Sequence, residues 1–289
     1  MVRKLLLAIT APLLVLSACA DRSSVETSGV AAAEPVDLLR QAPDRALEAG
    51  SGRIEMTTTM VIDGVTRELT ATGAFAGTRA RLELDMGELL AAEAPGESLP
   101  TGADEPLEVV VDGTSTYLRM PLLTSLTGVD GWLSMTAADL GQSGDPLGLG
   151  AGGTNPMQML DALRGVSSDI EPIGASSDGE THGYEVTVDL TKAAEKLPEA
   201  MREAYREQAA SLGTTELPLE VWVDGDGLVR VLKVDLADLA AGAEELAGFE
   251  SGQLEVRFSD YGEDITVDVP DPAEVTPFTE VMGSIGSAR

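Results

Sequence analysis

Residues 54–64 decide the fold, and they read Ile54-Glu55-Met56-Thr57-Thr58-Thr59-Met60-Val61-Ile62-Asp63-Gly64. Apolar residues return at every second position from Ile54 to Ile62, with one interruption at Thr58, which is the period of a β-strand with one buried face. Asp63-Gly64 is the strongest short signal for a two-residue hairpin turn. The stretch therefore predicts a strand that ends at Ile62 and a partner that begins at Val65.

The same alternation continues into two further strands. After the turn the apolar residues stand at odd positions, namely Val65, Leu69, Ala71 and Phe75. A second turn is predicted at Ala76-Gly77. After it the apolar residues stand at even positions, namely Ala80, Leu82, Leu84 and Met86. Residues that flank a two-residue turn share a face, which pairs Ile62 with Val65 and Phe75 with Thr78. One shared buried face fixes the register of all three strands.

The rest of the chain repeats this pattern with a few helices between groups of strands. Strands are predicted over 107–111, 114–120, 131–135, 169–175, 184–190, 217–223, 228–236 and 254–258, with an edge strand over 265–269. Helices are predicted over 36–48 with a break at Pro43, after Asn155-Pro156, and over 191–212. This order is typical of an α+β fold with helices gathered on one face of an antiparallel sheet.

The N-terminus carries an export signal. Two positive charges, an apolar run of about a dozen residues and Leu16-Ser17-Ala18-Cys19 follow one another. The run is too short for a transmembrane helix, which needs about 20 residues. Leu-Ser-Ala-Cys resembles the bacterial lipobox, so residues 1–18 are interpreted as a signal peptide and Cys19 as the lipidated residue. Residues 19–34 are small and polar, which indicates a flexible tether.

Composition restricts the partners. The chain has a formal charge of −30, so it repels phosphate backbones and nucleic acid is not expected as a partner. Anionic headgroups repel it too, and the lipid on Cys19 is therefore the expected attachment to the extracytoplasmic face of the cell membrane. Cys19 is the one cysteine, which excludes a disulfide within the chain.

The sequence offers little catalytic or metal-binding chemistry. His182 is the one histidine, and no nucleophile elbow accompanies it. Asp224-Gly225-Asp226-Gly227 resembles half of a calcium loop but lacks the further ligands, and its flanks read as strands, which favours a turn. No metal, no cofactor and no enzymatic activity are predicted.

Methionines stand out in a chain whose aromatic content is only 3%. Methionine adapts to irregular apolar partners, although it also fills gaps in ordinary cores. Small residues on the strands, such as Ala71, Gly73 and Ala80, leave little bulk for the interior. Because an empty apolar space lowers stability, a bound acyl chain would stabilise such an interior.

Several features follow one another in a characteristic order along the chain. They are the lipobox at Cys19, the tether, the helix before Gly50-Ser51-Gly52-Arg53-Ile54, the turn Asp63-Gly64, the helix after Asn155-Pro156, and the segments 184–189, 217–224 and 259–265 with Val269-Pro270. In this order and spacing the chain resembles the LppX/LprAFG lipoproteins, which share the fold of the LolA carrier. The resemblance implies a strongly bent antiparallel half-barrel over residues 35–270 with helices on its concave face. Residues 271–289 are expected to be a loosely held tail.

The resemblance also implies a lipid or glycolipid ligand in an apolar cavity between sheet and helices. The face predicted to hold an acyl chain comprises Ile54, Met56, Met60, Ile62, Leu82, Leu84, Met86, Val109, Leu118, Met120, Met157 and Leu160. A different hypothesis is a tethered interaction or sensor module with a closed core and no lipid ligand. An envelope enzyme is a third, disfavoured one.

Overall fold

The described part of the chain forms one large sheet with a few helices. The strands are β1 (Ser51–Ile62), β2 (Val65–Ala76), β3 (Arg79–Asp85), β4 (Leu107–Asp112), β5 (Ser115–Arg119), β6 (Trp132–Thr136), β7 (Val166–Ala175), β8 (Thr181–Asp189), β9 (Glu216–Asp224), β10 (Val229–Asp235), β11 (Phe249–Ser259) and β12 (Val275–Pro277). The helices are α1 (Pro35–Ala49), α5 (Pro156–Ala162) and α6 (Leu190–Lys196), with short 3-10 turns η1 (Leu163–Gly165) and η2 (Pro272–Glu274).

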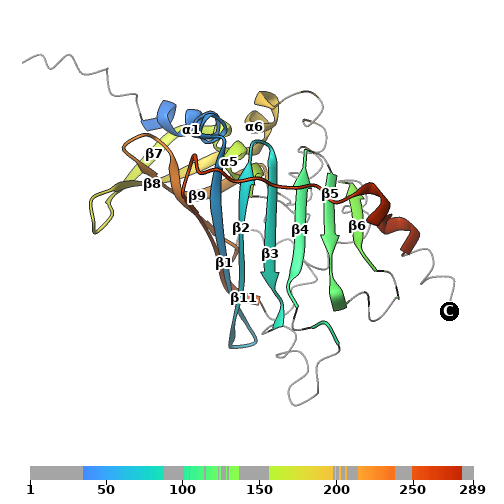
Figure 1. The fold of residues 1–289 in the computed structure, drawn as a ribbon. Helices are drawn as coiled ribbons and strands as arrows, with labels where there is room; N and C mark the ends of the chain where they lie inside the picture. The colour runs from blue at the N-terminus through green and yellow to red at the C-terminus, as the bar shows by residue number, and fades with distance from the viewer. Residues whose placement is uncertain are drawn as a thin grey trace, which may run out of the picture. The chain divides into compact units, whose positions relative to one another are not determined.

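This computed structural model describes residues 35–87, 101–103, 105–113, 115–122, 124, 128, 130–136, 156–197, 199, 202, 206, 214–237 and 249–281. Within these ranges the sheet has twelve strands in the order β12-β6-β5-β4-β3-β2-β1-β11-β10-β9-β8-β7 (Figure 1). Every neighbouring pair is antiparallel except β12 with β6. A mostly antiparallel sheet with a few separate helices confirms the predicted α+β class. The sheet is curved and unclosed (Figure 1).

The first hairpin has the predicted register. Ile62 pairs with Val65, and both turn residues have positive φ, 52° at Asp63 and 74° at Gly64, as a type I′ turn requires. The predicted second turn is wrong by one residue. Ala76 pairs with Arg79 and Phe75 with Ala80, because Gly77, with φ of 60°, occupies the first turn position.

Helix α1 runs through Pro43 without the predicted break. Pro43 lies on the buried side of the helix, between Ala42 and the buried Ala46. The helix is also held from outside itself, since Arg40 donates from Nε and Nη2 to the carbonyl oxygen of Val166 at 2.9 and 2.7 Å. Tertiary contacts therefore offset the backbone hydrogen bond that a proline removes.

One face of the sheet carries the hydrophobic core. Its residues come from β1 to β11 and from α1, α5, η1 and α6, and they form a single buried cluster. The described helices pack over the part of this face near β1, β7 and β8. Few of the cluster's side chains are aromatic: Phe75 and Phe258 are the two phenylalanines among its buried residues.

The opposite face is crossed by the chain that follows β11, which we call the crossing segment (residues 260–274). Its beginning is bonded to β1, because the hydroxyl of Ser51 donates to the carbonyl oxygen of Glu263 at 2.5 Å. From there the segment continues across the sheet to β6 (Figure 1). Val267 lies in a second small cluster with Val110 and Trp132. Val110 points away from the main core because it alternates with the core residues Val109 and Val111.

The crossing segment corrects two predictions. Residues 265–269 form no strand; the added strand is β12, which pairs in parallel with β6. The segment from Asp271 is not loosely held up to residue 281, since β12 belongs to the sheet and Val281 is 3% exposed in the main core. Both errors have one cause. The positions of residues 265–281 depend on contacts with distant parts of the chain, and no local sequence period predicts such contacts.

Candidate functional site

Seven of the twelve residues predicted to hold an acyl chain lie in the main core. They are Ile54, Met56, Leu82, Leu84, Val109, Leu118 and Leu160, none more than 5% exposed. The strands bring several of them into one row. Ile54 pairs with Gly73, Gly73 with Leu82, Leu82 with Val109 and Val109 with Leu118, which joins five strands on one face.

The other five residues lie at the margin of this face. Met86, Met120 and Met157 are partly buried and pack against the core cluster. Met60 and Ile62 stand on the core side of β1, in register with Ile54 and Met56, but they are partly exposed and do not belong to the buried cluster. The predicted set therefore divides into a buried interior and a margin rich in methionine.

The unequal lengths of the strands explain why Met60 and Ile62 are partly exposed. β3 pairs with β2 as far as Thr70 and Asp85, while the β1–β2 hairpin continues to Ile62 and Val65. Val65 is 53% exposed. The apolar alternation of β1 thus extends past the part of the sheet that β3 supports.

Several sequence predictions fall outside the described residues. These are Cys19 with the signal peptide and tether, Asn155, the Gly-rich stretch 141–155 and most of the helix predicted over 191–212. Among the described residues, no three His, Cys, Asp or Glu side chains are grouped so that they could hold a metal ion. None of the helices in the described ranges is both long and apolar enough to span a membrane. His182 is an exposed residue of β8.

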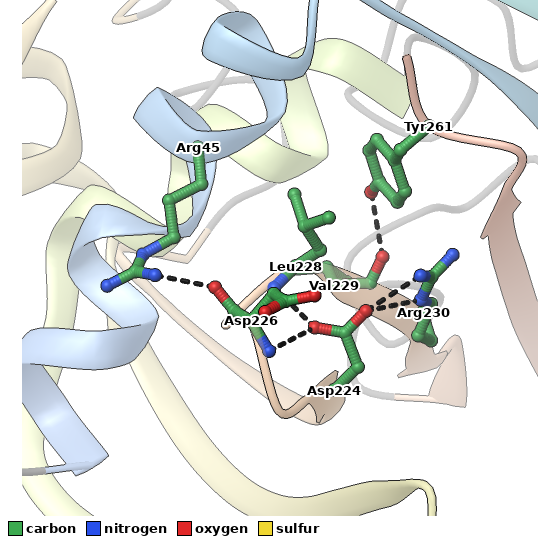
Figure 2. Close-up of polar contacts among 7 residues, drawn as sticks. All are labelled: Arg45, Asp224, Asp226, Leu228, Val229, Arg230 and Tyr261. Carbon is green, nitrogen blue, oxygen red and sulfur yellow. Dashed lines mark hydrogen bonds and ion pairs between the residues drawn. The ribbon is translucent and has the colours of Figure 1, made fainter. Parts of the chain in front are cut away.

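The Asp224 loop is a turn, as favoured from the sequence (Figure 2). Asp224 Oδ1 accepts from the backbone N–H groups of Asp226 and Leu228, both at 3.0 Å. Its Oδ2 accepts from Arg230 Nε and Nη2 at 2.7 Å. Both carboxylate oxygens are thus used within the β9–β10 hairpin.

Tyr261 connects this turn to the crossing segment. Its hydroxyl donates to the carbonyl oxygen of Val229 at 2.7 Å, and the Arg230 guanidinium lies 5.2 Å from its ring centroid. Burial raises the pKa of Tyr261 well above the usual value, since the phenolate would lose its hydration. Arg45 Nη1 of α1 donates to the carbonyl oxygen of Asp226 at 2.5 Å (Figure 2), which ties the helix to the same turn.

Sequence reasoning missed a buried carboxylate on the outward face of β4. Glu108 is 6% exposed and pairs with Arg81 and with Arg119, the latter at 2.6 Å. Both guanidinium groups also lie about 6 Å from the ring centroid of Trp132, at 6.0 and 5.8 Å. The sequence contained a signal for this buried charge, namely a glutamate within the apolar run Leu107-Glu108-Val109-Val110-Val111. The neighbours of Glu108 predict a strand that is buried on both faces, so the glutamate is expected to be buried with them.

Comparison with known proteins yields distant similarity over most of the chain. No family model matches. A Streptomyces griseus protein described as an uncharacterized 31.2 kDa protein in the rplA-rplJ intergenic region is 26% identical over 270 residues, which cover 89% of this chain and 84% of that protein.

Two solved structures are similar at low identity. Lipoprotein LppX of Mycobacterium tuberculosis has 14% identity and a TM-score of 0.44, covering 81% of this chain and 97% of LppX. LprF of Mycobacterium bovis has 12% identity and a TM-score of 0.41, covering 81% of this chain and 96% of LprF.

Proposed function

We propose that this protein is a membrane-anchored lipoprotein of the extracytoplasmic face that binds an acyl chain of a lipid or glycolipid. The lipid on Cys19 attaches it to the membrane. The acyl chain lies against the apolar face of the sheet and enters at the margin that contains Met60, Ile62 and Met86.

The observation that carries the proposal is the change in burial along one apolar face. Ile54 and Met56 are buried, whereas Met60 and Ile62 continue the same face of β1 and stay partly exposed. Apolar surface that continues a core beyond its buried limit is available to a ligand. Methionine side chains suit an acyl chain because they are flexible and polarizable.

A pair of variants on β1 tests this placement. Met60 and Val61 are adjacent, both are partly exposed, and they point to opposite faces. In protein purified from membranes, native mass spectrometry is expected to show a lipid retained by the parent and by Val61→Lys. Met60→Lys is expected to lose that lipid, because it puts a charge where the acyl chain enters.

Thermal unfolding of both variants after removal of lipid serves as the control. Equal melting temperatures of the lipid-free variants, together with unequal lipid retention, support the proposal. If the parent carries no lipid and takes none up from vesicles, or if both variants lose lipid equally, the proposal is wrong.

The burial of the interior favours a second candidate function. Seven of the predicted residues are closely buried, as in a core that needs no ligand. In that case the protein is a tethered interaction or sensor module. A parent protein that is free of lipid yet fully stable would support it.

A further inference from the structure

A recess lies on the face of the sheet opposite the hydrophobic core, and we call it the polar hollow. Its volume is about 1070 Å³. Its floor is formed by outward residues of the central strands, such as Glu55, Thr72 and Lys233. The β7–β8 turn at Asp178 forms one rim, and Val267 of the crossing segment belongs to another. This volume is slightly above the usual range for small-molecule sites, about 300–1,000 Å³, and suits a ligand of several units.

The polar hollow is balanced in charge, unlike the chain as a whole. Acidic residues outnumber basic ones by 49 to 19 over the full sequence. The hollow is lined by five basic residues, namely Arg53, Arg81, Arg230, Lys233 and Arg257, and by five acidic ones, namely Glu55, Glu83, Asp178, Glu180 and Asp224. An anion would meet the carboxylates and a cation would meet the guanidinium groups, so the balance favours an uncharged ligand.

The five basic groups are already paired with carboxylates but keep free hydrogen-bonding capacity. Arg230 binds Asp224 at 2.7 Å, Arg257 binds Glu255 at 2.5 Å and Arg53 binds Asp260 at 3.3 Å. A guanidinium has five N–H donors and a carboxylate about four acceptor positions, so these pairs leave donors and acceptors over. Hydroxyl groups both donate and accept, and they match such a surface without breaking its ion pairs.

Trp222 forms an aromatic wall of the polar hollow. It lies on the outward side of β9, opposite Gly183 of β8. A Cβ at Gly183 would lie 2.8–2.9 Å from Cε2, Cζ2 and Cδ2 of the indole, so one ring face rests on the glycine. The other face is left to line the hollow. An aromatic face attracts the weakly positive C–H groups on the apolar side of a sugar ring.

The floor argues against an extended peptide as the ligand. Peptides that add to a sheet need an unpaired strand edge. Here β3, β2, β1, β11, β10 and β9 are each paired on both sides. The buried side chains of these strands belong to the core on the other face, so they offer no anchor point to a peptide that lies on this floor.

We propose that the polar hollow binds a neutral oligosaccharide, with one sugar ring stacked on Trp222 and its hydroxyl groups bonded to the paired charged side chains. This site is independent of the lipid proposal, since it lies on the opposite face of the sheet. A protein with both sites would hold a lipid and a glycan at once.

Tryptophan fluorescence tests the site in the full chain, purified in lauryldimethylamine oxide because that detergent has no sugar headgroup. The chain has two tryptophans, and Trp132→Phe leaves Trp222 as the reporter. The probes are maltohexaose, cellohexaose, mannohexaose and chitohexaose, with sodium phosphate as the charged comparison. At least one hexaose is expected to change the fluorescence saturably, with a Kd below about 1 mM. Isothermal titration calorimetry of Trp222→Ala is expected to show at least tenfold weaker binding.

Two outcomes would overturn the proposal. The first is no response to any hexaose, or a saturable response to phosphate alone, which would indicate an anion site. The second is unchanged hexaose affinity in Trp222→Ala. Where that variant unfolds early, NMR of the unaltered protein decides: the Trp222 indole N–H signal must shift saturably with the hexaose, and by more than that of Trp132, which is not among the residues that line the hollow.

Discussion

The hydroxyl of Tyr261 donates a hydrogen bond to the carbonyl oxygen of Val229 at 2.7 Å, across 32 positions of sequence. This bond joins the start of the crossing segment to β10, beside the Asp224 turn. The Tyr261 ring also contacts Phe75 edge-on and stacks with Phe258, at centroid distances of 5.8 and 6.5 Å. One side chain thus connects the hydrophobic core with the segment that covers the opposite face.

Tyr261→Phe is expected to lower the free energy of unfolding by about 1 kcal/mol, because the ring contacts remain and only the hydrogen bond is lost. Burial raises the pKa of Tyr261 in the folded protein above its unfolded value of about 10. The folded state therefore holds this proton more tightly, and its contribution is complete below pH 10 and declines as the pH rises above it. Urea unfolding between pH 8 and 11 checks both effects, since the alkaline decline that Tyr261 causes must be absent in the phenylalanine variant.

The Glu108 cluster predicts unequal effects for its partners. Arg81 and Arg119 have side chains 41% and 48% exposed, while that of Glu108 is 7% exposed. Glu108→Gln leaves two arginines that water can solvate, so the expected loss of stability is about 1 kcal/mol. Replacing both arginines by glutamine leaves a buried carboxylate without a counter-charge, and the expected loss is about 3 kcal/mol. Equal losses in denaturant unfolding would show that Glu108 is solvated in the folded protein.

The position of the Trp222 ring is predicted to require a glycine at position 183, because the ring leaves no space for a Cβ there. Gly183→Ala puts a methyl group into the indole and is expected to cost about 1–3 kcal/mol. Gly225→Ala is the matched control, because nothing lies within 4 Å of a Cβ at that position. In the double variant Gly183→Ala with Trp222→Ala most of the loss is expected to disappear, so a double-mutant cycle measures the contact. Additive losses would mean that the glycine is needed for another reason.

Cys19→Ala is expected to move the protein out of the membrane fraction or to leave an uncut precursor. Two acyl chains make a stable anchor, and the net negative charge of the chain repels anionic membranes. Fractionation followed by intact mass measurement checks this. A variant that is still cut and still sediments with membranes would contradict the lipobox interpretation.

The sequence predicted those parts of the fold that local patterns determine. The Ile62–Val65 register followed from strand alternation and a turn whose two residues tolerate positive φ. The crossing segment was not predictable, because its position depends on contacts such as Ser51 with Glu263 and Val267 with Trp132, which are far apart in sequence. The polar hollow was missed for a related reason. Outward residues of a strand read as ordinary surface, although Trp222 among the outward positions of β9 was an available signal.

Ala80 and Met86 stand on the same face of the sheet, one in the buried interior and one at the margin. Ala80 of β3 is 1% exposed and lies between Phe75 and Val111, while Met86, just after β3, is partly buried. Ala80→Trp is expected to lower stability by about 1–3 kcal/mol or more, because the added ring has no space there. Met86→Trp is expected to cost less and to weaken lipid uptake, because its ring occupies the proposed entrance.

Thermal unfolding with and without added lipid measures both effects. A ligand that binds only the folded state raises the melting temperature, and it does so more strongly the higher its concentration is relative to its Kd. The lipid is therefore expected to stabilise the parent protein and to stabilise Met86→Trp less. If Ala80→Trp costs nothing, the interior itself is open, and the acyl chain would lie deeper than the margin. If Met86→Trp takes up lipid as the parent does, the entrance lies elsewhere on the apolar face.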